Sequence, residues 1–305
     1  MREALSRAAR PALLLAVILS AFLSSPLGRP MLIGSYQPNN PGSTGQLTEF
    51  AREAGFTPRI ASYYTSDFAQ PFAAQFAREM AAQGTQVLLQ WQPRGTTNAA
   101  IASGQEDAVI RAAAQAVATV NATVIISYGQ EMNGSWYPWG NAAPNTPADY
   151  IAAYRRVWAV FQEMKTYNVT WLWDPNVSYT GSSPLKSWYP GDQYVDWAGL
   201  DGYFSSPSVT FDGLFGPSIA ELRSFTAKPL VIGESGVTGE AGRQQIQELF
   251  AGAALAGAVA IVYFDEAQSG DPMHQDWRLE NNPGAMQKFR EMIQVYGQRP
   301  LVYPG

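Results

Sequence analysis

Short apolar runs alternate with amphipathic runs along most of this chain, and this alternation limits the possible folds more than any other feature. Eight runs are continuous and apolar, as expected for strands buried on both faces; they are Met31–Tyr36, Pro58–Tyr63, Gln86–Trp91, Thr123–Tyr128, Val169–Trp173, Val195–Gly199, Pro229–Ile232 and Ala258–Phe264. Seven runs have helical spacing, namely Thr44–Ala54, Pro71–Gln83, Gln105–Val120, Pro147–Tyr167, Leu214–Thr226, Gly239–Ala256 and Pro283–Tyr296. The pattern predicts an α/β protein with a single (β/α)₈ TIM barrel, in which residues 174–194 form a loop with one turn where the fifth helix would lie.

An open, doubly wound sheet is the competing architecture. Such sheets usually carry a glycine-rich phosphate loop after a strand, and the chain has no GxGxxG or P-loop motif in that position. The chain has 305 residues, a length that barrels reach as one domain. No low-complexity linker divides it, so we expect residues 29–305 to form one catalytic barrel and the protein to be a monomer.

The first 28 residues are predicted to be a targeting segment. Three arginines lie within residues 1–10, and residues 11–23 are apolar, as in a secretory signal. The apolar run is short for a membrane span, which needs about 20 residues. No clean A-x-A cleavage site follows it, so residues 1–28 are either a signal peptide or an N-terminal anchor. We therefore expect a secreted or extracytoplasmic protein that touches the membrane only if this segment stays uncleaved.

Composition excludes several classes of function. The chain has no cysteine and one histidine, His274, which excludes disulfides, cysteine nucleophiles and HExxH zinc sites. The formal net charge is −5, whereas a nucleic-acid-binding protein would show a basic excess. Carboxylates, hydroxyls and a large stock of aromatic residues remain for chemistry, with 9 Trp, 15 Tyr and 14 Phe.

Two glutamates that follow predicted strands are the strongest candidates for chemistry. Glu131 comes after Thr123–Tyr128, and Glu234 after Pro229–Ile232. Because the C-terminal ends of barrel strands form the active face, we expect both carboxyl groups at one mouth. An apolar mouth raises the pKa of one carboxyl group, while hydrogen bonds keep another ionised, and glycoside hydrolysis uses such a pair. The structural alternative is that each glutamate caps a helix or pairs with an arginine.

Aromatic and amide residues near the strand ends indicate the class of substrate. Trp136 and Trp139 lie in a loop rich in Gly and Pro, where a platform for sugar rings is favoured over packing in the core. Sugar hydroxyls additionally need polar partners. The predicted substrate-binding residues are Trp91, Gln130, Trp136, Trp139, Asn176, Asp201 and Tyr263.

Two residues near the end of the sixth strand have competing interpretations. Tyr203 either donates its hydroxyl to an ionised nucleophile, which would lower the pKa of that carboxyl group, or covers the end of the strand. Asp201 either accepts a hydrogen bond from a sugar hydroxyl or has a structural role.

Four motifs of the chain resemble glycoside hydrolase family 26, which includes β-mannanases, β-1,3-1,4-glucanases and β-1,3-xylanases. Residues 130–140 (QEMNGSWYPWG) are similar to its strand-four signature, and residues 171–176 (WLWDPN) to its strand-five motif. Residues 189–203 (YPGDQYVDWAGLDGY) resemble its strand-six motif, and residues 229–236 (PLVIGESG) its nucleophile strand.

The resemblance implies a (β/α)₈ barrel and hydrolysis with retention of anomeric configuration. It implies that Glu131 is the acid/base and Glu234 the nucleophile. It further implies a hydrogen bond between Tyr203 and Glu234, and a position for Trp136 beside the scissile bond. The chain departs from the family at Gln130, where histidine is usual and where glutamine cannot ionise. It also lacks, after the eighth strand, the arginine that some mannanases use to hold a mannose.

The sequence thus predicts a retaining endo-β-glycanase that acts on a polysaccharide and needs no metal ion or cofactor. β-1,4-Mannan is the preferred substrate, and mixed-linkage β-glucan, β-1,3-xylan or the producer's own exopolysaccharide are the alternatives. A non-catalytic polysaccharide-binding barrel would retain the tryptophans but lose a carboxylate, whereas both are present. A single histidine disfavours a metal-dependent hydrolase.

Overall fold

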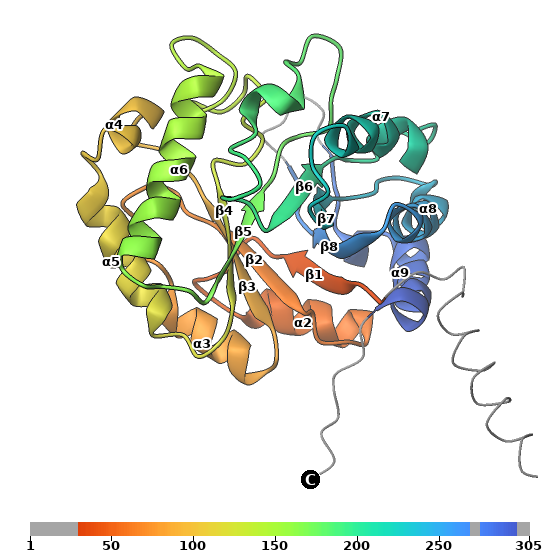
Figure 1. Ribbon diagram of the computed structural model, residues 1–305. Coiled ribbons are helices and arrows are strands. Elements are labelled where there is room, and N and C mark those ends of the chain that lie inside the picture. The colour runs from red at the N-terminus through yellow and green to blue at the C-terminus, as the bar shows by residue number, and fades with distance from the viewer. Residues whose placement is uncertain (1–29, 269–274, 298–305) are drawn as a thin grey trace, which may run out of the picture.

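Eight parallel strands close into a barrel in sequence order, which confirms the predicted (β/α)₈ architecture (Figure 1). The computed structural model describes residues 30–268 and 275–297, so the predicted targeting segment and His274 lie outside the described residues. The strands are β1 (Leu32–Tyr36), β2 (Ile60–Tyr64), β3 (Gln86–Trp91), β4 (Val124–Tyr128), β5 (Val169–Trp173), β6 (Trp197–Asp201), β7 (Leu230–Ser235) and β8 (Ala258–Phe264).

Helices surround the barrel as an outer ring (Figure 1). They are α2 (Gly45–Ala54), α3 (Ala74–Ala82), α4 (Asn98–Ala102), α5 (Asp107–Ala118), α6 (Pro147–Glu163), α7 (Phe211–Arg223), α8 (Gly242–Leu255) and α9 (Pro283–Tyr296). The short helix α4 was not predicted; it begins where the Thr97 side chain accepts a hydrogen bond from the Ala100 amide. A single 3₁₀ turn, Leu185–Trp188, stands in place of the fifth helix, as predicted. Within the described residues, no helix is long and apolar enough to cross a membrane.

The barrel interior changes from apolar to polar along the strands. Near the N-terminal ends lies an apolar layer formed by Ile60, Leu88, Ile125, Leu172 and Val231. Side chains two residues apart in a strand share a face, and two residues further along the same chain segments lies a buried polar layer of Ser62, Gln90, Ser127, Asp174 and Gly233. Two residues further again, Tyr64, Gln92 and Asn176 reach the pocket at the C-terminal ends. The interior thus supports a polar site on an apolar base.

The opposite faces of the strands pack against the surrounding helices and loops through large aromatic side chains. The rings of Trp91 and Phe68 stack with their centroids 4.9 Å apart, and Trp171 contacts Phe161 of α6 edge-on at 5.1 Å. Tyr263 of β8 contacts Phe289 of α9 at 5.4 Å. Fully burying such side chains contributes about 1.5–3 kcal/mol each, so this outer shell holds the helices onto the barrel.

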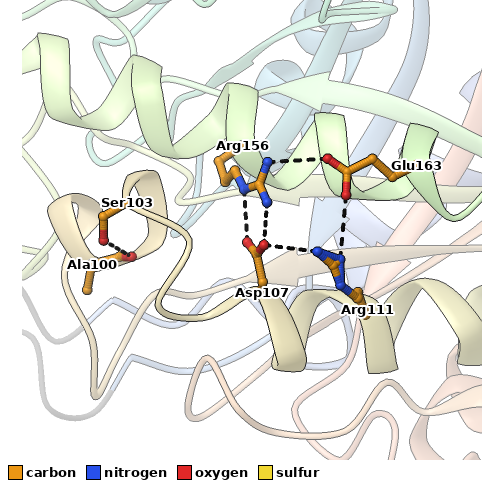
Figure 2. Close-up of polar contacts among 6 residues, drawn as sticks. All are labelled: Ala100, Ser103, Asp107, Arg111, Arg156 and Glu163. Carbon is orange, nitrogen blue, oxygen red and sulfur yellow. Dashed lines mark hydrogen bonds and ion pairs between the residues drawn. The ribbon is translucent and has the colours of Figure 1, made fainter.

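A cluster of four charged residues joins α5 to α6 (Figure 2). The Asp107 carboxylate accepts hydrogen bonds from Arg156 Nε at 2.9 Å and from Arg111 Nη2 at 3.1 Å. Both arginines also contact Glu163, at 3.3 and 3.5 Å. The hydrogen bond and charge of Arg156 hold the pKa of Asp107 below its usual range. Exposed ion pairs are worth only about 0–1 kcal/mol each, so the cluster joins the two helices but adds little to the stability of the fold.

Candidate active site

A pocket of about 590 Å³ opens at the C-terminal ends of the strands, and both predicted glutamates line it. Glu131 is 7% exposed and Glu234 is 6% exposed. Apart from these two, the wall consists of aromatic and polar side chains, namely Tyr36, Tyr64, Gln92, Trp136, Tyr137, Asn176, Tyr203, Phe264, Glu266 and Gln268. A second cavity of about 240 Å³ adjoins it over α2 and shares the Glu266 wall.

An unusual backbone turn places Glu131 in the pocket. Gly129 and Glu131 both have positive φ angles, of 56° and 53°, and the second is rare for a residue with a side chain. The turn is held by the Glu131 amide, which donates to the backbone oxygen of Asp174 at 2.8 Å. Outliers of this kind cost about 1–3 kcal/mol and cluster at functional sites, where the surrounding structure holds them in place.

Two side chains donate hydrogen bonds to the Glu131 carboxylate. Trp136 Nε1 lies 2.7 Å from Oε2, and Asn176 Nδ2 lies 2.6 Å from Oε1. Asn176 is itself fixed, because its backbone N–H and C=O both bond to the Asn133 side chain, at 2.9 and 2.8 Å. One carboxylate oxygen is thus held by the loop after β4, and the other by the segment after β5.

A bulge in β7 turns Glu234 into the barrel. Strict alternation from Val231 and Gly233 would point Glu234 toward the helices. The pairing of β6 with β7 shifts here, because Leu200 faces Ile232 whereas the next residue, Asp201, faces Glu234. Bulges re-aim side chains next to functional sites, and this one brings the carboxylate to the mouth of the barrel.

Three donors converge on Glu234. Tyr203 donates to Oε2 at 2.6 Å, and this is the hydrogen bond that the family resemblance implied. Tyr64 donates to Oε1, and Gln90 Nε2 lies 3.3 Å from the same oxygen. Sequence reasoning missed Tyr64 and Gln90. Side chains two residues apart in a strand share a face. Tyr64 therefore shares the inward face of Ile60 in β2, and Gln90 shares that of Leu88 in β3, so this periodicity predicts both inside the barrel.

Burial dominates the protonation of both glutamates. It raises the pKa of Glu131, and, together with the negative charge of Glu131, it raises the pKa of Glu234 to about 8. The hydrogen bonds described above oppose both shifts. Because two carboxylates in one buried pocket repel each other, the pair retains one proton near neutral pH.

An exposed aromatic pair borders the pocket on the Glu131 side. Trp136 is 49% exposed and Tyr179 is 40% exposed, and their ring centroids lie 5.7 Å apart. Large aromatic groups are seldom left this exposed next to each other unless they contact something. The indole of Trp136 therefore presents a face to the pocket while its N–H holds Glu131.

The structure does not place three of the predicted substrate-binding aromatics at the pocket, namely Trp91, Trp139 and Tyr263. Trp91 and Tyr263 point outward, because each lies one position from an inward-facing residue of its strand, and one position reverses the face. Trp91 Nε1 bonds to the Phe68 carbonyl at 2.9 Å, and the Tyr263 hydroxyl to the Trp277 carbonyl at 2.7 Å. Trp139 folds back under the loop and is 1% exposed. It stacks at 4.4 Å on Tyr137, which forms part of the wall.

Gln130 and Asp201 are also absent from the pocket lining, and both are fully buried. The structure therefore does not place these two predicted substrate-binding residues at the pocket. Gln130 lies beneath the loop, and its backbone oxygen accepts a hydrogen bond from Trp139 at 2.8 Å. Asp201 lies inside the barrel, which favours the structural alternative over contact with a sugar hydroxyl. Asn176 and Trp136, by contrast, line the pocket, and their contact with a substrate stays a prediction.

Comparison with known protein families resolves the classification. The sequence profile described as Glycosyl hydrolase family 26 matches residues 44–231, which is more than half of the chain. The chain belongs to glycosyl hydrolase family 26. The match includes Glu131 and Tyr203, whereas Glu234 lies three positions beyond its end and accepts a hydrogen bond from Tyr203.

Curated relatives of this family 26 chain differ in their activities. Endoglucanase H of Acetivibrio thermocellus is 28% identical over 252 residues, 78% of this chain and 27% of that protein. A mannan endo-1,4-β-mannosidase of Bacillus subtilis is 29% identical over 39% of this chain and 32% of that protein. A β-1,3-xylanase of Alcaligenes sp. is 30% identical over 44% of this chain and 27% of that protein. The chain thus spans about a third or less of the length of these relatives.

Solved structures share the fold of this family 26 chain. The catalytic domain of Bacillus sp. JAMB-750 GH26 endo-β-1,4-mannanase superposes with a TM-score of 0.65 and 20% identity, covering 92% of this chain and 90% of that one. A Cellulomonas fimi endo-β-1,4-mannanase gives a TM-score of 0.68 at 18% identity, covering 86% and 70%. Because both identities are 20% or lower, these structures show only that the fold is shared.

Proposed function

We propose that this family 26 protein is a retaining endo-β-glycanase that hydrolyses β-glycosidic bonds of a polysaccharide. The observation that carries the proposal is the pair of buried glutamates in one pocket, each held by its own set of donors. Retaining glycosidases place two carboxyl groups about 5–5.5 Å apart, and inverting ones about 6.5–9.5 Å. We expect the shorter separation in a crystal structure with a bound sugar.

The donors favour Glu234 as the nucleophile and Glu131 as the acid/base. The negative charge of Glu131 contributes to the raised pKa of Glu234 and disappears once Glu131 is protonated. Three donors then stabilise the ionised form of Glu234, whereas two would stabilise that of Glu131. Protonated Glu131 donates to the glycosidic oxygen while Glu234 attacks the anomeric carbon and forms a glycosyl-enzyme. Glu131 then deprotonates the water that releases the sugar.

The exposed aromatic pair supports binding of a polymer. Trp136 lies against the acid/base, which is the side of the leaving group, and Tyr179 extends that surface away from the pocket. Among the relatives, a mannan endo-1,4-β-mannosidase and a β-1,3-xylanase favour a β-linked polysaccharide. We propose β-1,4-mannan as the substrate, with mixed-linkage β-glucan, β-1,3-xylan and the producer's own exopolysaccharide as alternatives. The N-terminal sequence supports the further proposal that the protein is exported.

The test compares a panel of dyed polysaccharides with an activated aryl glycoside in two variants. Glu234→Ala removes the nucleophile and should abolish turnover of every substrate. Glu131→Ala should still form the glycosyl-enzyme from an aryl glycoside with an acidic leaving group, accumulate it as a burst, and be rescued by azide with a β-glycosyl azide as product. A β-glycosyl azide from Glu234→Ala, together with an α-glycosyl azide and no burst from Glu131→Ala, would reverse the two roles. Binding of polysaccharide without hydrolysis would point to a non-catalytic barrel.

A further inference from the structure

Two aspartates in the barrel interior have no role in the mechanism above. Asp174 follows β5 in the polar layer and Asp201 ends β6, and both are fully buried. The Asp174 carboxylate lies against the backbones of two neighbouring strands. A Cβ atom at Gly199 would lie 2.0 Å from its Oδ1, and one at Gly233 would lie 2.2 Å away. Glycine on both strands therefore makes the space that this carboxylate fills.

The two aspartate side chains act directly on each other, because a hydrogen bond between them lowers the pKa of Asp174 and raises that of Asp201. Two ionised carboxylates have no proton to donate, so a hydrogen bond between them requires that one be protonated. Without such a proton, neither oxygen of Asp201 nor Oδ1 of Asp174 has a partner among the described residues. Unpaired buried polar atoms are costly and rare in native structures, and one proton between the two groups gives each of them a hydrogen-bond partner.

The charges around the pair are all negative. Glu131 acts on both aspartates from the loop after β4, and Glu234 acts on Asp201 from β7. The other titratable groups that face the pair are tyrosines, whose pKa values burial raises so that they stay neutral: Tyr137, Tyr150, Tyr154 and Tyr203. Burial and these charges raise the pKa of Asp201 well above its usual range. Burial raises that of Asp174 to about 7, and the hydrogen bond from Gln90 opposes the rise.

Gln90 connects the aspartate pair to the pocket. Its Nε2 lies 3.3 Å from Asp174 Oδ2 and 3.3 Å from Glu234 Oε1. A primary amide has two N–H donors, so one nitrogen can serve both carboxylates. The amide has this orientation only while Asp174 is an acceptor, because a protonated Asp174 could instead donate to the Gln90 oxygen.

We propose that Asp201 and Asp174 share one proton, held by Asp201, and that the Asp174 carboxylate orients Gln90 so that it positions Glu234. The three residues would then be positioning residues that act through Glu234. The shared proton also leaves one negative charge beneath Glu234 instead of two, which favours its ionised form. The catalytic part of this inference rests on the proposed function, whereas the shared proton does not.

The kinetic test uses substitutions that keep or remove one of the contacts that connect Asp201 and Asp174 through Gln90 to Glu234. Asp201→Asn keeps a donor toward Asp174, so we expect kcat within about threefold of wild type. Asp174→Asn and Gln90→Met remove the support of Glu234, and we expect each to lower kcat by about 10- to 100-fold, the scale of a misplaced reacting group, with little change in KM. The double variant Asp174→Asn/Gln90→Met should lose no more than either single one, because both break the same contact. Ser127→Ala, in the same layer, is the matched control and should have wild-type kinetics.

A pH profile separates positioning from a merely structural role. Removing the Asp174 charge should move the acidic limb of kcat/KM to lower pH, because one negative charge fewer faces Glu234. The limb should stay in place in Ser127→Ala and in Asp201→Asn. Additive losses in the double variant, or equal losses in Asp174→Asn and Asp201→Asn, would overturn the positioning role.

The proton itself is detected without any substrate. In the infrared difference spectrum between wild type and Asp201→Asn at pH 7, we expect the loss of one protonated carboxyl band. Aspartate labelled with ¹³C at the side-chain carboxyl should likewise show, in the wild-type protein, one carboxyl group that stays neutral between pH 5 and 8. This measurement stands even if the variants fail to fold. Ionised signals alone would overturn the proposal, whereas a neutral signal in a protein that hydrolyses no polysaccharide would refute the proposed function and leave the shared proton intact.

Discussion

Tyr64→Phe removes one of the three donors to Glu234 and leaves the ring in place. The hydroxyl donates directly to Glu234 Oε1. A hydrogen bond to a charged group is worth about 1.5–3 kcal/mol, and one pKa unit corresponds to about 1.36 kcal/mol. The donor stabilises the ionised carboxylate, so its loss should raise the pKa of Glu234 by about 1–2 units. Because the nucleophile must be ionised, the acidic limb of kcat/KM should move upward by the same amount.

The assay is the pH dependence of kcat/KM with an activated aryl glycoside, for which protonation of the leaving group matters least. Below the acidic limb, activity should fall by about 10-fold or more relative to wild type, whereas at the optimum it should change less, because a less stabilised carboxylate is also more nucleophilic. Tyr63→Phe is the matched control. Tyr63 is the preceding residue, it points toward the helices, and its hydroxyl only accepts from the Ala73 amide at 3.3 Å. An unmoved acidic limb in Tyr64→Phe, or an equal shift in Tyr63→Phe, would refute the reasoning.

Three further predictions follow from the same geometry. The pKa of about 8 at Glu234 is raised above that of the unfolded chain, so the free energy of unfolding should fall as pH rises toward 8. Glu234→Gln should therefore be more stable than wild type at pH 8 but not at pH 4, as thermal unfolding would show. Tyr179→Ala should raise KM for long oligosaccharides by about 2- to 10-fold and leave KM for small aryl glycosides unchanged. Tyr167→Ala, which changes an exposed tyrosine on the loop before β5, is the control and should change neither KM. An equal effect of both substitutions would show that Tyr179 does not contact the substrate. Gly233→Ala would place a Cβ atom 2.2 Å from Asp174 and should destabilise the fold by about 1–3 kcal/mol, whereas Gly216→Ala, with open space around it, should be neutral or stabilising in denaturant unfolding.

The strands and most helices could be predicted because their signals are local. Apolar runs and helical spacing reflect burial of a face, and Pro147 after the Thr146 cap marks the start of α6. The pairing of Glu131 with Glu234 followed from topology alone, since strand ends of a barrel meet.

Whether an aromatic side chain at a strand end points into the barrel or toward the helices could not be predicted in the same way. A position at or near the end of a strand predicts a pocket residue at Trp91 and Tyr263, but an offset of one position reverses the face of a side chain. Counting from Leu88 or Val262 would have corrected both. Trp139 is different, because a loop has no period, and its stacking on Tyr137 depends on how residues 129–140 turn back. The bulge at Glu234 likewise has no signal in the strand pattern.

The polar layer of the barrel has a consequence for folding specificity. Parallel strands made of continuous apolar residues can slip by two positions and still present the same faces to the core and to the helices. In this chain, such a slip of β5 would carry Leu172 to the level of Gln90 and Ser127 and lift Asp174 from its place between the glycines of β6 and β7. A buried polar residue can select one alignment among several of similar hydrophobic energy, as a single asparagine does in a coiled coil. We therefore expect Ser62→Ala/Ser127→Ala to raise the unfolding midpoint while broadening the transition, and an unchanged slope would show that the register is set elsewhere. The buried polar layer beneath the pocket would then also fix the register between neighbouring strands.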